Sequence, residues 1–83
     1  MMKIHELKTY KEYFELVKSG VKQFEIRIDD RDFEIGDELV LKEWDRVNLV
    51  YTGRFLHRKV DYMLKGGQFG LAEEYVVMSI SKI

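Results

Sequence analysis

The residues best suited to chemistry lie close together in segment 20–27. This segment reads Gly-Val-Lys-Gln-Phe-Glu-Ile-Arg and fits the pattern G-x-K-x-x-E-x-R. Arg27 is suited to bind phosphate bidentately, and Lys22 is suited to bind it as a point charge. Glu25 can accept hydrogen bonds from a base amino group or act as a general base on water. We therefore predict a ligand-binding site formed by Lys22, Glu25 and Arg27.

A surface ion-pair ladder is the alternative interpretation of the same three residues. Exposed ion pairs are common and contribute only about 0–1 kcal/mol each to stability. The two interpretations differ in one structural respect. A binding site needs the three side chains to face a hollow, whereas a ladder leaves them in bulk water.

A helix predicted over residues 9–19 leads into this segment. Thr9 followed by Glu12 fits a capping box at the helix start. Apolar residues then recur at helical spacing. Gly20 fits the left-handed position that ends many helices.

The segment itself continues as a predicted strand. Phe24, Ile26 and Ile28 alternate with polar residues, which indicates an apolar face toward the core and an outward face carrying Glu25 and Arg27. In a regular strand Lys22 would share the face of Phe24. It must therefore precede regular pairing, or lie at a bulge, to join the other two charges.

The rest of the chain predicts four more strands, over residues 3–8, 38–44, 49–64 and 74–83, with Gly53 as a bulge in the third. The order is β-α-β-β-β-β, about five strands and one early helix. Closing the sheet into a small β-barrel plugged by the helix would protect the strand edges. An open sheet covered by the helix is the alternative. The predicted fold class is α+β, in a single domain over residues 1–83.

Charge composition gives no general support for nucleic-acid binding. The 14 Lys and Arg nearly balance the 15 Asp and Glu, for a net charge of −1. The region between Asn48 and Lys65 is locally basic, however, since it holds four bases and one acid. We include three of these bases, Arg54, Arg58 and Lys59, as candidate ligand contacts. A solvated strand face is the alternative.

Several classes of protein are disfavoured by composition. The chain has no cysteine, which excludes disulfide scaffolds, thiolate zinc sites and thiol nucleophiles and favours the reducing cytoplasm. No secretory h-region and no apolar run of about 18 residues is visible, so no membrane partner is expected. His5 and His57 are too few and too scattered for a metal site, and no cofactor is predicted.

The G-x-K-x-x-E-x-R segment resembles the signature of the ASCH domain, within the PUA-like superfamily. An ordered set of further segments resembles the small bacterial and phage DUF3850 group of ASCH-like proteins. These segments are residues 4–7, 13–14, 24–27, 30–33, 36–37, 43–44, 70–71 and 75–77. The resemblance implies a PUA-like barrel of five or six strands, with a cleft that holds Lys22, Glu25 and Arg27.

The resemblance implies RNA or nucleotide binding, which is the general proposal for ASCH domains. The basic strand and aromatics such as Phe33, Trp44 and Phe69 could extend the groove, since single strands are read by stacking. A second possibility comes from small ASCH-like amidohydrolases that deacetylate N4-acetylcytidine. Those enzymes have Thr where this chain has Glu25, so Lys22 and Glu25 would be the catalytic candidates. A protein-interaction module is the third possibility. The oligomeric state is left open.

Overall fold

Five strands and one helix make up the protein, whose computed structural model describes residues 2–83. They follow the chain as β1 (Ile4–Tyr10), α1 (Lys11–Lys18), β2 (Phe24–Ile28), β3 (Glu38–Asp45), β4 (Val50–Lys65) and β5 (Tyr75–Lys82). The predicted β-α-β-β-β-β order is therefore confirmed. In residues 2–83, no helix is both long enough and apolar enough to span a bilayer.

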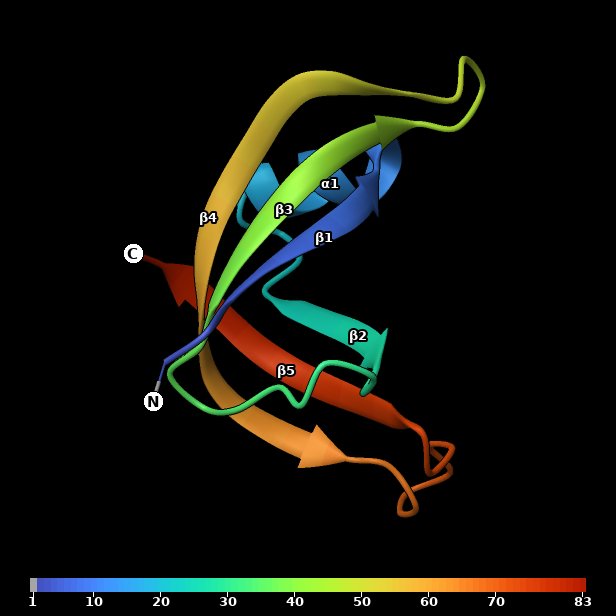
Figure 1. Ribbon diagram of the computed structural model, residues 1–83. Coiled ribbons are helices and arrows are strands. Elements are labelled where there is room, and N and C mark those ends of the chain that lie inside the picture. Colours follow the sequence, from blue (N-terminus) through green and yellow to red (C-terminus); the bar gives the residue numbers. More distant parts are fainter. Residues whose placement is uncertain (1) are drawn as a thin grey trace.

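The strands form one mixed sheet in the order β1-β3-β4-β5-β2. β1 runs parallel to β3, and the other neighbouring strands are antiparallel. The long, strongly bent β4 carries the curl of the sheet, and α1 lies behind β1 and β3 (Figure 1). Within residues 2–83, β1 and β2 are the two edges and do not pair with each other. The fold is thus a half-barrel with an open seam between β1 and β2.

The concave side of the sheet holds the hydrophobic core. β3 contributes Leu39 and Leu41, and β4 contributes Val60, all of them completely buried. Further buried apolar residues come from β1, α1, the loop after β2, and β5, namely Leu7, Val17, Phe33, Val76, Met78 and Ile80. The strands predicted over 38–44 and 74–83 are confirmed, and their apolar side chains two residues apart reach the same face.

The predicted helix start at Thr9 is wrong. Thr9 belongs to β1, where it is the register partner of Glu43, and the helix begins only at Lys11. Tyr10 occupies the N-cap position and makes no side-chain cap hydrogen bond. Parallel pairing with β3 extends β1 to Tyr10, so the backbone bonds of the sheet replace the capping box. The helix end is confirmed, since Gly20 has a φ of +86° directly after the cap residue Ser19.

A hairpin joins β3 to β4, and the predicted bulge lies close to it. Asp45 accepts hydrogen bonds from the backbone amides of Val47 and Asn48 at 2.9 and 3.1 Å. The bonds from the Asn48 backbone and side chain lower the pKa of Asp45. Gly53 has a φ of +92°, at a register shift where residues 52–54 of β4 lie opposite a single residue of β3. The bulge bends the strand at the place where glycine best tolerates this backbone conformation.

Lys3, His5, Glu34 and Asp37 form a polar cluster around the buried His5 and Asp37, and we call it the Asp37 corner. One oxygen of Asp37 accepts the backbone amide of Lys3 at 2.9 Å. The other lies 2.8 Å from His5 Nε2 and accepts the backbone amide of Glu34 at 2.9 Å. Burial alone raises the pKa of Asp37, but these hydrogen bonds outweigh it and leave the pKa below the ordinary value. The corner ties the first strand to the turn before β3.

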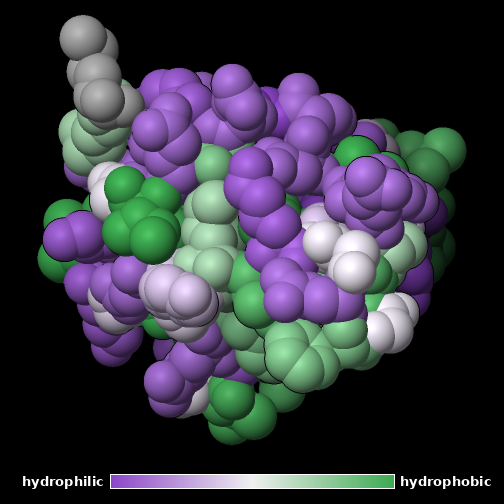
Figure 2. Space-filling model, turned by 90° about the horizontal axis from the view of Figure 1, so that it is seen from below, coloured by the Kyte–Doolittle hydropathy of each residue, from purple (hydrophilic) through white to green (hydrophobic). Residues whose placement is uncertain are grey.

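The convex side of the sheet is not uniformly polar. Large apolar side chains such as Phe55 and Tyr62 are 58% and 63% exposed. Viewed from below, hydrophobic residues are exposed between strongly hydrophilic ones (Figure 2). The convex side and the face seen from below therefore both carry apolar residues that the fold itself does not cover.

Candidate functional site

Strand β2 turns its charged residues inward. Glu25 is only 3% exposed, whereas Phe24, Ile26 and Ile28 are 43%, 49% and 51% exposed. The predicted alternation is correct, but the assignment of its apolar face to the core is wrong. β2 lies at the edge of the half-barrel, next to the seam. Its inner face is directed into the seam, toward polar groups of β1 such as the Thr9 hydroxyl, and not onto the apolar core.

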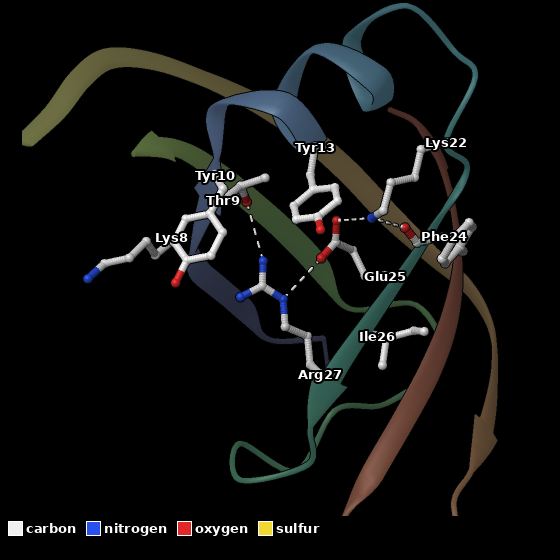
Figure 3. A pocket seen from close by; sticks show the side chains of 9 residues that line it. All are labelled: Lys8, Thr9, Tyr10, Tyr13, Lys22, Phe24, Glu25, Ile26 and Arg27. Carbon is white, nitrogen blue, oxygen red and sulfur yellow. Dashed lines mark hydrogen bonds and ion pairs between the residues drawn. The ribbon is translucent and has the colours of Figure 1, made fainter. Parts of the chain in front are cut away.

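Three charged side chains converge there, and we call them the charged triad. Lys22 Nζ donates to Glu25 Oε1 at 3.0 Å, and Arg27 Nε donates to Glu25 Oε2 at 3.0 Å. Glu25 lies between the two cations and bonds to both (Figure 3). The structure thus brings Lys22, Glu25 and Arg27 together.

The helix-to-strand turn brings Lys22 into this group. The backbone amide of Lys22 donates to Leu16 O at 3.0 Å, which anchors the turn to the helix end. Regular pairing begins at Phe24, so Lys22 is free of the strand alternation. Its ammonium group also donates to Phe24 O at 2.7 Å. Lys22 therefore precedes the strand, as the sequence required for it to join Glu25.

A pocket of about 560 Å³ opens in front of the charged triad. It lies across the open seam, with one wall from the end of β1 and from α1 and the other from β2 and the turn before it. Its lining residues are Lys8, Thr9, Tyr10, Tyr13, Lys22, Phe24, Glu25, Ile26 and Arg27. A pocket of this size is typical for a small organic ligand.

The charged triad has one positive charge in excess, from two cations and one carboxylate. It also has spare hydrogen-bond donors. Lys22 has three N–H groups, of which two are used, and Arg27 has five, of which its bonds to Glu25 and Thr9 use two. The side chains of Lys22 and Arg27 are 15% and 24% exposed, so both reach the pocket. This arrangement suits an anionic ligand.

Thr9, Tyr10 and Tyr13 line the pocket although sequence reasoning assigned them no role there. Arg27 Nη2 donates to the hydroxyl of Thr9 at 3.3 Å. The two tyrosine rings lie 6.5 Å apart, beside the charged triad (Figure 3). The alternation of β1 could have indicated Thr9, because it shares a face with His5 and Leu7. The apparent capping box instead assigned Thr9 to the start of the helix.

The basic residues of β4 do not join this pocket. Arg58 points inward, is 8% exposed, and donates to Val17 O at the helix end at 3.3 Å. Arg54 pairs with Glu15 at 2.9 Å and with the buried Glu43 at 3.4 Å. Lys59 is exposed on the convex side. Strand alternation and the distance from the seam separate all three from the charged triad.

None of the three aromatics considered for the groove lines the pocket. Phe33 is buried in the core against His5, with 4.6 Å between the ring centroids. Phe69 is 89% exposed in the turn before β5 and does not line the pocket. Trp44 lies on the convex side of β3, next to Tyr51.

The fold and site together define a small half-barrel protein with a charged pocket at its open seam. The profile of the family described as "Domain of unknown function (DUF3850)" matches residues 4–80. The chain therefore belongs to the DUF3850 family.

Proteins similar to this chain include a curated phage protein and a solved structure. The "Uncharacterized 12.9 kDa protein in GpA 3'region" of Escherichia phage P2 is 47% identical over 60 residues, which are 72% of this chain and 53% of that protein. The chain thus spans about half the length of this curated relative. A solved structure, "Crystal structure of hypothetical protein PH0355", superposes with a TM-score of 0.68 over 99% of this chain and 100% of the other. At 20% identity, that likeness shows a common fold.

Proposed function

We propose that the seam pocket binds a nucleotide, either free or within single-stranded RNA, with a phosphate held by Lys22 and Arg27. The observation that supports this most directly is the excess positive charge around the buried Glu25. Lys22 and Arg27 both donate to the Glu25 carboxylate, and both line the pocket with further N–H donors to spare. A structural ion pair would need only one cation.

The pocket also has aromatic walls for a nucleoside. Tyr10 and Tyr13 are 38% and 47% exposed beside the charged triad. Aromatic faces bind bases by stacking with little regard to sequence, while Arg and Lys bind phosphate. A cleft between the edges of a curled sheet fits the ASCH, PUA-like relationship, which we include in this proposal together with a cytoplasmic location.

An amidohydrolase acting on N4-acetylcytidine fits the pocket less well. That chemistry needs a hydroxyl where this chain has Glu25. Among the nine lining residues, the aliphatic hydroxyl is that of Thr9. It donates to Leu7 O at 3.4 Å and accepts from Arg27, on the β1 side of the seam. Turnover of N4-acetylcytidine by the purified protein would nevertheless show this activity directly.

Binding of AMP and of a labelled single-stranded RNA tests the proposal, by calorimetry and by fluorescence anisotropy. Arg27→Gln should weaken both by about 10- to 100-fold, since a charge-assisted hydrogen bond contributes about 1.5–3 kcal/mol. Arg31→Gln is the matched control, because Arg31 is 47% exposed outside the pocket and should bind normally. Equal affinities for the two variants, or no binding by the wild type, would contradict the proposal. Capture of a protein from nuclease-treated lysate would then favour an interaction module.

A further inference from the structure

The convex side of β1, β3 and β4 carries aromatic and basic side chains in two neighbouring rows. The first row is Tyr10, Trp44 and Tyr51, one from each strand and paired in register. The second row is Lys8, Lys42 and Phe55, also in register. We call these six residues the aromatic face.

Cations lie directly over the rings of the aromatic face. Lys8 Nζ is 4.0 Å from the centre of the Trp44 ring, and Lys42 Nζ is 4.7 Å from that of Tyr51. Trp44 and Tyr51 meet edge to face, with 4.8 Å between centroids. Tyr51 and Phe55 are 47% and 58% exposed. Exposed rings of this kind, combined with mobile cations, are what single-stranded nucleic acids use for stacking and phosphate contact.

The aromatic face is continuous with the seam pocket. Lys8 and Tyr10 belong to both, because they line the pocket and also stand in the two rows. The amine of Lys8 extends away from the charged triad (Figure 3), toward Trp44. A chain that leaves the pocket over β1 would therefore pass directly onto Trp44.

Charge on the aromatic face favours a nucleic acid as the occupant. Within residues 2–83, Lys8 makes no ion pair. The neighbouring acid Glu6 is already paired with Lys42, at 3.3 Å. Arg46, in the hairpin, lies 4.7 Å from the ring centre of Tyr10 and is paired with Glu12. Stacking of a base on an aromatic ring is stronger than an exposed cation–π contact. A base can therefore displace Lys8 from the ring of Trp44. The Lys8 ammonium group is then free to bind a phosphate.

We propose that the aromatic face is a second binding surface, which takes the nucleotides that follow the one held in the seam pocket. This inference rests on the proposed function, and it specifies the ligand as single-stranded nucleic acid rather than a free nucleotide. The three strands span roughly 10 Å across the sheet, which gives room for about two further nucleotides.

Two probes separate this inference from the pocket itself, namely AMP and a labelled single-stranded uridine octamer. The octamer should bind more tightly than AMP and should quench the fluorescence of Trp44, the only tryptophan of the chain. Trp44→Ala should weaken octamer binding by about tenfold and leave AMP binding unchanged. Phe55→Ala, at a residue of the aromatic face that is 58% exposed and does not line the pocket, should weaken the octamer alone by about threefold.

Tyr62→Ala is the matched control, since Tyr62 is an exposed aromatic residue of the same β4 but outside the aromatic face. If the octamer binds no more tightly than AMP, or if Trp44→Ala and Phe55→Ala behave like Tyr62→Ala, the inference is overturned while the pocket proposal stands. If neither probe binds, both fail. If only the octamer binds, with dependence on Trp44 and not on Arg27, the aromatic face stands and the pocket proposal fails.

Discussion

Two buried carboxylates, Asp37 and Glu25, are satisfied in opposite ways. Asp37 is completely buried. Its carboxylate accepts hydrogen bonds from two backbone amides and lies within hydrogen-bonding distance of the His5 ring. Glu25 is nearly as buried, yet its partners are the flexible side chains of Lys22 and Arg27.

The difference separates a structural role from a binding role. A backbone amide cannot leave its acceptor unless the chain moves, so the Asp37 corner fixes the ends of two strands. A Lys or Arg head group can rotate toward a ligand and keep one bond to its carboxylate. The pocket in front of Lys22 and Arg27 gives a ligand access, and no residue of the Asp37 corner lines it.

The largest effect is expected from Asp37→Ala. The substitution leaves two amides and the His5 ring without their acceptor, which should lower the free energy of unfolding by about 3–5 kcal/mol. Urea denaturation measures this change. Asp30→Ala is the control, because the Asp30 side chain is 68% exposed and should change stability by less than about 0.5 kcal/mol. Similar values for the two variants would refute a structural role for the corner.

A smaller loss of stability is expected from Glu25→Gln, together with tighter anion binding. The two cations keep access to water through the pocket, so the cost should be about 1–2 kcal/mol. The net charge of the triad rises from one to two positive charges, which should strengthen binding of inorganic phosphate by about threefold. Calorimetry measures the affinity. Weaker phosphate binding would show that Glu25 helps to hold the ligand.

The smallest effect concerns acid pH. Because the pKa of folded Asp37 is lowered, its stabilising contribution is complete above the ordinary Asp pKa of about 3.9 and is lost as the pH falls through the lower folded pKa. Urea midpoints of the wild type and Asp37→Asn should therefore converge on acidification from about pH 6 to pH 2.5. Midpoints that diverge instead would mean that the carboxylate is not the form stabilised by the fold.

Local pattern was sufficient for most of the elements. The helix end at Gly20, the turn at Asp45 and the bulge at Gly53 were predictable, because each depends on the backbone preferences of a few adjacent residues. The G-x-K-x-x-E-x-R segment also indicated the charged triad, since Lys22 could join Glu25 only by preceding the strand.

The long-range arrangement was not predictable from local pattern. Thr9 looked like a helix cap, but its strand pairs with residues more than 30 positions away. Arg58 looked like part of a basic surface, yet its strand turns it inward to the helix end. The aromatic face likewise combines three strands whose register no local pattern reveals.

The sequence by itself determined which side chains share a face, because the alternation of a strand is a property of the backbone. Only the tertiary structure decided which face of β2 is the inner one. That choice depends on the open seam, because the half-barrel leaves its edge strand β2 beside polar groups of β1 instead of the apolar core. Glu25 and Arg27 turn inward for that reason, and Phe24, Ile26 and Ile28 are left outside.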